Sequence, residues 1–471
     1  MGSERKRQIS ALQKKKIDAV LATVLPEVKP TEKEIERVTA YANEIMSRLK
    51  KIVPRDVEII SAGSVARGTQ VRGTSDIDIF LLFPRSMSEE TMEKKGVEIA
   101  KKIVAKHKNE SFVIKYSEHP YLKLILGDLG VNADIVPAFK ITNSSQRISA
   151  VDRTQLHNVF MLENLTKSQK DDVRLLKAFL KSHGIYGSDS KTEGFSGYLC
   201  ELLVYHFGSF VSLLAGISGI HLPVIIDPLH RATLTDKKDV VKTLIKKFNK
   251  EFVVLDPTDE NRNVAAVVSN ESLARFVVVS RLFLGNPTLG LFYGPRYSDI
   301  YSKRKLTRLR EELGLEIYTL YFKVPDIADD IIWQQIKRLG GSLNSILHRN
   351  GFNVIMMFEN VGSKEAILSL FVGNSKMGYS VAEGPSAFME ESAGKFMAAH
   401  SKALGMLFKD DRIVFIEEPK YGNVKDLINA SLTQNILPSY IKKEHTKLYV
   451  NDMPEPVAKL LYSAFIKKTS I

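Results

Sequence analysis

Two aspartates at the start of an apolar run constrain this chain more than any other feature of its sequence. Asp76 and Asp78 are two residues apart, and Ile77–Phe83 has the composition of a buried β-strand. Side chains two apart on a strand leave the same face, so the carboxylates lie together while Ile77 and Ile79 point into the core. Neighbouring carboxylates repel each other unless a cation lies between them. Hard oxygen ligands suit Mg²⁺, and the pair therefore predicts a magnesium site.

A third carboxylate, Asp134, is embedded in a later apolar run. The chain between Asp78 and Asp134 is long enough for a helix and two more strands before a strand returns beside the first pair. Three acids that meet on one face of a sheet can hold two metal ions. Such ions activate an attacking oxygen and stabilise the leaving phosphate of an in-line displacement.

A Gly-Ser pair precedes the aspartates. Gly63 and Ser64 fall where a strand ends and a helix begins, and Arg67 follows within one turn. Backbone N–H groups, the Ser64 hydroxyl and the Arg67 guanidinium can hold a triphosphate at such a point. In the alternative interpretation, the two aspartates are turn acids and the Gly-Ser pair is an ordinary helix cap. The third acid argues against that interpretation.

Length and pattern predict a mixed α/β (α+β) protein with three domains. At about 100–200 residues per domain, 471 residues allow two to four domains. We expect a mixed sheet with helices in residues 1–150, a helical domain in 151–285 and an α+β region in 286–471. Thr31 and Glu34 form a capping box that predicts a helix over residues 32–51. The expected strands are residues 57–61, Ile77–Phe83, 112–116, 121–126, 131–136, Glu316–Lys323, 353–359 and Glu365–Val372.

Composition limits the partners and the compartment. With one cysteine, Cys200, the chain has no intramolecular disulfide and no cysteine-cluster zinc site, which suits a reducing, cytoplasmic setting. Residues 202–226 lack Asp, Glu, Lys and Arg, but His206, His221 and Pro223 favour a buried core helix plus loop over a membrane span. The net charge of +13 favours a polyanionic partner without separating nucleic acid from membrane or from simple solubility.

The acidic motif resembles the signature of the polymerase-β-like nucleotidyltransferase superfamily. Four later segments make the chain similar to the archaeal-type (class I) CCA-adding tRNA nucleotidyltransferases. The resemblance is dense over residues 59–293 and weaker beyond. The segments are Ser149-Ala-Val-Asp-Arg-Thr-Gln-Leu-His, Asp171-Asp-Val-Arg-Leu-Leu-Lys-Ala-Phe-Leu, Gly194-Phe-Ser-Gly-Tyr-Leu-Cys-Glu-Leu-Leu-Val and Asp256-Pro-Thr-Asp-Glu-Asn-Arg-Asn-Val-Ala-Ala.

The resemblance implies a nucleotidyltransferase head, a helical neck and a C-terminal RNA-binding region, with roles assigned by position. The metal-binding catalytic carboxylates are Asp76, Asp78 and Asp134, and the triphosphate contacts are Ser64 and Arg67. The positions that hold the incoming nucleotide are Thr154, His157, Lys177 and Tyr186, and Arg262 matches the arginine that reads the base edge of CTP or ATP.

Two departures from the family pattern affect these roles. Asp76 stands where Glu is frequent, and Gln155 replaces a common Pro, which leaves the pose of Thr154 and His157 open. Each nucleotide contact also has a structural alternative. His157 is then a helix histidine, Lys177 part of a solvated face and Tyr186 a core aromatic. Arg262 becomes a local ion pair with Asp259 or Glu260, worth about 0–1 kcal/mol if exposed.

The implied activity is untemplated transfer of CMP, CMP and AMP from CTP and ATP to the 3′ end of tRNA. The expected partners are the acceptor and T-arm of tRNA and no DNA or membrane; a homodimer is possible. The basic residues expected to contact tRNA, within a run that also contains Tyr297 and Tyr301, are Lys303, Arg304, Lys305 and Arg308. A solvated linker face is the alternative for that run. The competing functions are a poly(A) polymerase or oligonucleotide synthase, and a catalytically dead RNA-binding scaffold.

Overall fold

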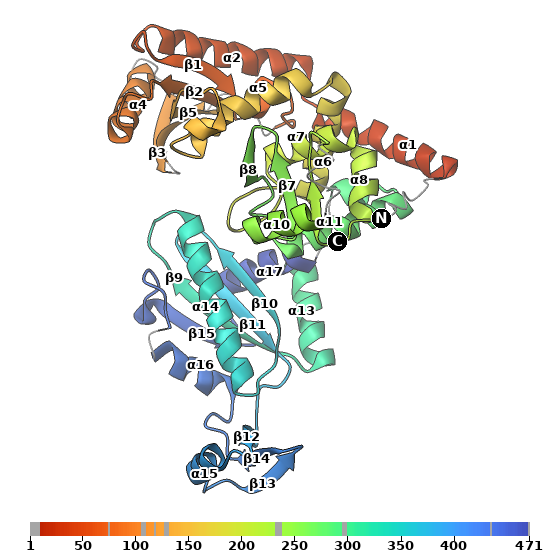
Figure 1. Cartoon of the computed structure of the whole chain (residues 1–471), viewed down its shortest axis with the longest axis vertical. Helices are drawn as coiled ribbons and strands as arrows, with labels where there is room; N and C mark the ends of the chain where they lie inside the picture. The colour runs from red at the N-terminus through yellow and green to blue at the C-terminus, as the bar shows by residue number, and fades with distance from the viewer. Residues whose placement is uncertain are drawn as a thin grey trace. The chain divides into compact units, whose positions relative to one another are not determined.

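The computed structural model describes residues 10–73, 76–104, 110–116, 119–126, 131–230, 238–293, 299–433 and 436–469. The chain divides into two compact units, Met1–Gly294 and Pro295–Ser470 (Figure 1). The division into three domains at residues 150 and 285 stays a prediction.

A five-stranded mixed sheet forms the first part of the N-terminal unit. Its strand order is β1-β2-β5-β4-β3, with β2 parallel to β5 and the other neighbours antiparallel. The five expected strands and the return of the third acid beside the first pair are therefore confirmed. The elements are α1 (Ala11–Val28), α2 (Glu32–Lys50), β1 (Glu58–Ala62), α3 (Gly63–Arg67), β2 (Ile77–Phe83), α4 (Glu89–Val104), β3 (Glu110–Tyr116), β4 (Pro120–Leu126) and β5 (Val131–Phe139).

The alternation of residues along β2 gives this sheet two different faces. Ile77, Ile79, Leu81 and Phe83 pack in one core with residues of α2 and α4. Asp78 lies between Ile77 and Ile79 and so leaves the opposite face. Helix α2 begins at the predicted capping box, with Thr31 and Glu34 bonded reciprocally.

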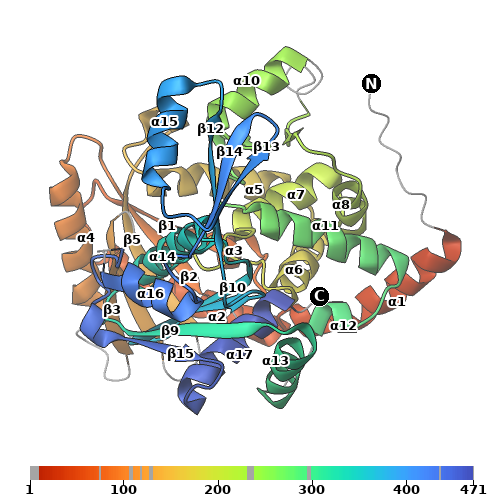
Figure 2. The same cartoon turned by 90° about the horizontal axis from the view of Figure 1, so that it is seen from below.

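The rest of the N-terminal unit is mostly helical and was expected to be so. Helices α6, α7, α8 and α11 gather in one bundle in both views (Figures 1 and 2). The short three-stranded sheet β6-β7-β8 was not foreseen. The elements are α5 (Thr154–Asn164), α6 (Lys167–Ser182), α7 (Gly197–Phe207), α8 (Phe210–Ser218), β6 (Val224–Ile226), α10 (Lys238–Phe248), β7 (Phe252–Asp256), β8 (Asp259–Asn263), α11 (Asn270–Gly285) and α12 (Gly290–Tyr293).

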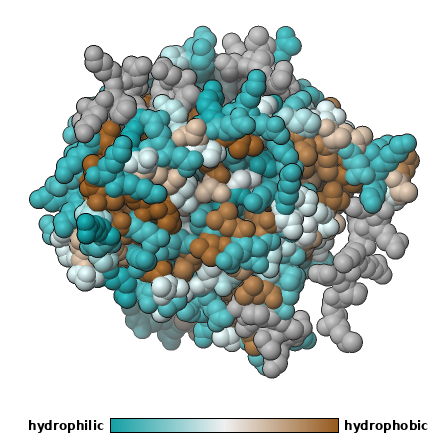
Figure 3. All heavy atoms as spheres, turned by 90° about the horizontal axis from the view of Figure 1, so that it is seen from above, coloured by the Kyte–Doolittle hydropathy of each residue, from teal (hydrophilic) through white to brown (hydrophobic). Residues whose placement is uncertain are grey.

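The uncharged stretch folds into this bundle. Phe210 and Leu213 of α8 are fully buried, and Phe210 packs edge-to-face on Phe179 with ring centroids 5.7 Å apart. In the described part of the chain, no single helix is long and apolar enough to cross a membrane. The pair α7 and α8, bent by 91°, passes the length and composition test only when taken together. The surface drawn in Figure 3 mixes hydrophilic and hydrophobic residues.

The C-terminal unit is built on a four-stranded antiparallel sheet of order β10-β11-β9-β15, with a small separate sheet β12-β14-β13. Helices α14 and α16 contribute to the core on one face of the larger sheet, and α13 and α17 to the core on the other. The elements are α13 (Asp299–Leu313), β9 (Glu316–Lys323), α14 (Asp329–Arg349), β10 (Val354–Val361), β11 (Glu365–Val372), β12 (Ser380–Ser386), α15 (Glu390–Ala399), β13 (Gly405–Lys409), β14 (Arg412–Glu417), α16 (Val424–Thr433), β15 (Thr446–Val450) and α17 (Glu455–Thr469). The expected α+β pattern is confirmed.

Candidate active site

The parallel pairing of β2 and β5 brings the three aspartates together. Asp78 is the register partner of Asp134, and Asp76 immediately precedes β2. On the next strand, Lys123 is the register partner of Asp134. The Lys123 Nζ lies 3.1 Å from Asp134 Oδ1 and 3.6 Å from Asp76 Oδ2, and Asn132 Nδ2 donates to Asp76 Oδ1 at 3.3 Å.

The negative charge of the three carboxylates exceeds the positive charge beside them. Burial, followed by the charges of Asp134 and Asp76, raises the pKa of Asp78 to about 7. Burial likewise raises the pKa of Asp134, although Lys123 opposes this shift. The pKa of Lys123 is raised, because the charge and hydrogen bond of Asp134 outweigh burial. A hard divalent cation would relieve this imbalance, so the donor set fits such an ion.

Gly63 provides the space for the Asp78 carboxylate. A Cβ on Gly63 would lie 1.7 Å from Asp78 Oδ2, and Gly63 has φ +72°, which favours glycine. The predicted strand-to-helix turn is present, since β1 ends at Ala62 and α3 begins at Gly63. Ser64 is half-buried in the first turn of α3. No larger residue at position 63 leaves this carboxylate in place.

Arg67, expected at the triphosphate, and Lys177, expected to hold the incoming nucleotide, meet around one buried acid. Arg67 Nε donates to Glu201 Oε2 at 2.9 Å, and the Thr69 hydroxyl donates to Glu201 Oε1. Lys177 Nζ donates to the Thr69 carbonyl at 3.0 Å and to the Thr69 hydroxyl at 3.2 Å. All four side chains are buried. Lys177 is therefore not part of a solvated helix face.

Tyr186, in the segment between α6 and α7, lies beside the same group, with its hydroxyl near the first residue of α7. A Cβ on Gly197 would come within 3.4 Å of the Tyr186 hydroxyl and 3.8 Å of Lys177 Nζ. Burial raises the pKa of Tyr186, so its hydroxyl stays protonated and can donate a hydrogen bond. The structure thus brings Arg67, Lys177 and Tyr186 together.

A second network surrounds Asp256 at the end of β7. His157 Nε2 lies 2.9 Å from Asp256 Oδ2, and Arg262 Nη1 donates to the same oxygen at 2.9 Å. Tyr198 donates its hydroxyl to Asp256 Oδ1 at 3.1 Å, and Thr258 donates to that oxygen from its backbone N–H and its hydroxyl. The rings of His157 and Tyr198 stack with centroids 3.9 Å apart. Burial lowers the pKa of His157, which favours the neutral ring.

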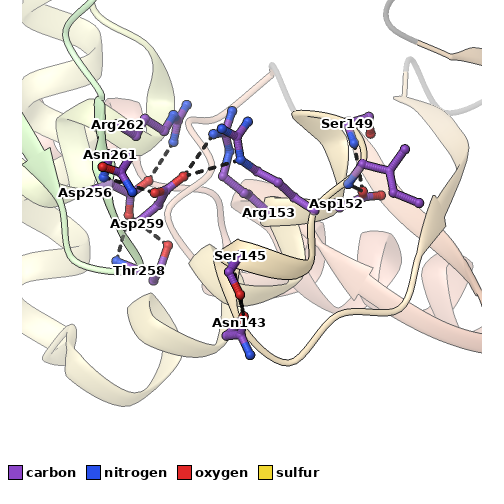
Figure 4. Close-up of polar contacts among 12 residues, drawn as sticks. Asn143, Ser145, Ser149, Asp152, Arg153, Asp256, Thr258, Asp259, Asn261 and Arg262 are labelled. Atoms are coloured by element: carbon purple, nitrogen blue, oxygen red, sulfur yellow. Dashed lines mark hydrogen bonds and ion pairs between the residues drawn. The ribbon is translucent and has the colours of Figure 1, made fainter. Parts of the chain in front are cut away.

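Figure 4 shows Arg262 pointing to Asp256, while Arg153 points to Asp259. The ion pair of Arg262 is therefore made with Asp256, whose side chain is fully buried, and not simply with the sequence neighbours that the alternative interpretation named. The Arg262 side chain keeps 29% of its surface exposed and remains accessible to a ligand.

Gln155 has a structural role that a proline cannot supply. Its amide oxygen accepts from the Ile141 N–H at 3.1 Å, and its amide nitrogen donates at 2.8 Å to the carbonyls of Phe139 and Asp152. These bonds fix the start of α5, where Thr154 is the first residue and His157 lies one turn later. Gln155, although it departs from the family pattern, therefore anchors the start of the helix that carries Thr154 and His157 to the end of β5.

The basic residues expected to contact tRNA lie on α13. Arg304 is exposed, Lys305 Nζ lies 5.6 Å from the centre of the Phe465 ring, and Arg308 pairs with Glu312 at 2.7 Å. The side chains of Lys303 and Tyr301, and all of Tyr297, lie outside the described residues.

Sequence reasoning did not assign Lys123, Glu201 or Asp256. Lys123 is a cation that alternates with buried leucines on β4, and Glu201 is the one acid of the apolar helix α7. Asp256 opens a segment that carried the resemblance. Each residue had a signal, but its partners are distant in sequence, and only the fold identifies them.

Three known families match consecutive parts of the chain. Residues 42–157 match the nucleotidyltransferase domain, 171–293 the second domain of tRNA nucleotidyltransferase and 313–447 the C-terminal domain of CCA-adding enzyme. The CCA-adding enzyme of Methanocaldococcus jannaschii is 36% identical over 448 residues, which are 92% of this chain and 95% of that protein. The CCA-adding enzyme of Methanosarcina acetivorans is 33% identical over 89% of this chain and 90% of its own length. The CCA-adding enzyme of Archaeoglobus fulgidus is 37% identical over 72% of this chain and 71% of its own length.

Proposed function

The chain belongs to the family of CCA-adding enzymes, and on that premise we propose that it transfers CMP, CMP and AMP in turn from CTP and ATP to the 3′ end of tRNA. It is a nucleotidyltransferase. The observation that carries the assignment of its chemistry is the pairing of Asp78 with Asp134 on adjacent parallel strands. Asp76 joins them through the shared contact with Lys123.

In each cycle the 3′-oxygen of the RNA attacks the α-phosphorus of the nucleotide. A bond forms between them, the bond from the α-phosphorus to the bridging oxygen breaks, and pyrophosphate leaves. We assign Asp134, the carboxylate on the strand beside Asp78, to the proton of the attacking hydroxyl. Asp76, Asp78 and Asp134 would hold divalent cations, which we take to be Mg²⁺; when bound, such ions stabilise charge on the reacting phosphate.

The remaining site residues bind and orient the nucleotide. Arg67 and Lys177 supply positive charge for the triphosphate, with the Ser64 and Tyr186 hydroxyls as further donors. His157 and Arg262 both contact Asp256, and we assign Thr154, at the start of the same helix as His157, to the nucleotide as well. Arg262 holds a planar set of donors there that suits a base edge.

The tRNA would be held mainly through its phosphates. We propose that Arg304 and Arg308, both exposed on α13, contribute with Lys303 and Lys305 to the grip on the acceptor and T-arm. The single buried cysteine suits work in the cytoplasm. Homodimer formation stays a prediction that sedimentation velocity would test.

The decisive experiment uses tRNA that lacks its last three nucleotides, with CTP, ATP and Mg²⁺. We expect C, C and A to be added, after which extension stops. A long A tail would instead assign the chain to the poly(A) polymerases, and binding without any addition would make it a scaffold. Asp78→Asn is the matched control: it should abolish addition and leave tRNA binding within about twofold of wild type, since one neutralised acid removes no phosphate contact.

A further inference from the structure

We propose that Glu201 is a positioning residue that holds Arg67 directly and Lys177 chiefly through the Thr69 hydroxyl, since Lys177 Nζ itself lies 3.9 Å from Glu201 Oε1. Both cations would then face one nucleotide triphosphate. The inference rests on the proposed function and deepens it, because it names what keeps the triphosphate contacts in place and charged. Glu201 itself is fully buried and is not expected to touch the nucleotide.

The hydrogen-bond directions around Thr69 leave one arrangement. A lysine ammonium only donates, so the Thr69 hydroxyl accepts from Lys177 Nζ at 3.2 Å. The proton of that hydroxyl is then free to go to Glu201 Oε1, which only accepts. Glu201 Oε2 takes the Arg67 Nε–H at 2.9 Å. Both oxygens of one carboxylate are thereby engaged, each toward a different cation.

The network joins elements that are far apart in sequence. Arg67 ends α3, directly after the turn that holds Asp78, and Thr69 follows it. Lys177 lies on α6 and Glu201 on α7. A buried carboxylate between them fixes the spacing of the two cations, as a supporting residue must do for a site held to within about 0.5 Å.

Charge balance gives Glu201 a second effect. Two cations share one buried anion, which leaves one positive charge for the nucleotide. Burial lowers the pKa of Lys177, and Glu201 opposes that shift. The groups that face Lys177 are Glu201 and the Cys200 thiol from α7, Arg67 from α3, Arg174 from α6 and, beside Gly197, the Tyr186 hydroxyl. Glu201 is the anion among them that keeps Lys177 protonated.

The first test is Glu201→Gln, which keeps the shape of the side chain and removes its charge. The KM for CTP and ATP should rise about tenfold or more, with a smaller change in kcat, because charge-assisted bonds to the triphosphate weaken. The pKa of Lys177 should fall further, and a lysine loses its charge as pH rises through its pKa. The KM of the variant should therefore begin to rise at a lower pH than that of wild type. Isothermal titration with a non-reacting CTP analogue gives the same comparison without turnover.

The second test removes the link without touching an ion. Thr69→Val deletes the hydroxyl between Lys177 and Glu201, and Thr69→Ser restores it. We expect the valine variant to raise the KM and the serine variant to stay within about twofold of wild type. If Glu201→Gln does not fold, these two variants still test whether Glu201 positions Lys177. Glu359→Gln, which separates an acid from Lys468 2.8 Å away in the C-terminal unit, controls for the loss of a partly buried ion pair.

The results separate this inference from the function on which it rests. Wild-type protein that binds neither CTP nor ATP would remove the proposed function. Wild-type binding with an unchanged KM and pH profile in folded Glu201→Gln, or with an unchanged KM in Thr69→Val, would overturn the positioning role alone. A lowered Tm without any change in nucleotide affinity would make Glu201 purely structural and would also overturn it.

Discussion

Asp78 holds its negative charge at an energetic cost that a pH titration can measure. Its pKa is about 7 in the folded protein against an ordinary 3.8, mainly because of burial. Between these values the folded state binds more protons than the unfolded state, so stability falls as pH rises. Asp78→Asn should therefore stabilise the cation-free protein at pH 8 by up to about 4 kcal/mol and change little at pH 4, by urea unfolding in EDTA.

Added Mg²⁺ is the control for that prediction. It should stabilise wild type more than Asp78→Asn, because the variant lacks one of the acids that would bind the ion. Equal stability of the two proteins in EDTA at pH 8 would show that the Asp78 charge is not held at a cost.

Asp256 has the opposite electrostatic character. Burial alone would raise its pKa, but hydrogen bonds from His157, Thr258 and Arg262 hold the pKa well below its usual range. Its contribution to stability is present above the ordinary pKa of 3.8 and is lost as pH falls through the folded pKa. Asp256→Asn leaves Arg262 without a charged partner and should cost about 3–5 kcal/mol at pH 7, measured by denaturant unfolding.

Tyr198→Phe is a matched control at the same site. It removes one hydrogen bond of 3.1 Å to Asp256 and keeps the aromatic ring beside His157, so the expected cost is about 1 kcal/mol. A cost as large as that of Asp256→Asn would mean that the hydroxyl, and not the buried charge, carries the network.

At the scale of the element, the short helix α3 begins at one glycine and ends before another, and the two differ in the space around them. Gly63 and Gly68 both have positive φ, +72° and +67°. An added Cβ at Gly63 meets Asp78 Oδ2 at 1.7 Å, whereas at Gly68 the nearest atom is the flexible Lys170 Cδ at 3.7 Å. Gly63→Ala should abolish nucleotide addition. Gly68→Ala should cost about 1 kcal/mol of backbone strain and retain most activity.

The assay for this pair is addition to truncated tRNA, with the Tm of each variant alongside. Similar activity in both variants would contradict the close approach of Asp78 to the turn. A folded but inactive Gly63→Ala protein is the expected result.

Elements whose signals are local were predictable from the sequence. The capping box at Thr31 and the apolar run Ile77–Phe83 act over a few residues, and the structure has both where they were expected. The sheet β6-β7-β8 was missed because its strands have three to five residues and β8 is polar. Strands this short depend on their neighbours more than on their own composition.

The residues of the site likewise divide into those that the sequence predicted and those that it did not. The three acids and the glycine turn could be read from spacing, since strand alternation decides which side chains share a face. The partners of Glu201 and Asp256 could not, because Arg67 and His157 reach them across 134 and 99 residues of chain. Burial of paired charges depends on the completed fold.

At the scale of the whole molecule, a chain with a net charge of +13 carries an acidic centre in its N-terminal unit. Asp76, Asp78 and Asp134 repel a polyanion unless cations bind there, so tRNA affinity has to come from lysines and arginines elsewhere in the chain. The basic side chains described on α13 differ in their freedom: Arg304 is exposed, whereas Arg308 already shares its charge with Glu312.

This difference leads to a prediction about salt dependence. Phosphate contacts release counterions, so the association constant of full-length protein for tRNA should fall by about 10³ or more between 50 and 200 mM KCl, measured by filter binding. Arg304→Ala should reduce the slope of log K against log salt by about 1, as expected for one lost phosphate contact. Arg308→Ala should change the slope less, because Glu312 already neutralises part of the charge of Arg308. Equal slopes for wild type and Arg304→Ala would exclude α13 from the phosphate-binding surface. The lysines and arginines that contact tRNA would then lie on other elements.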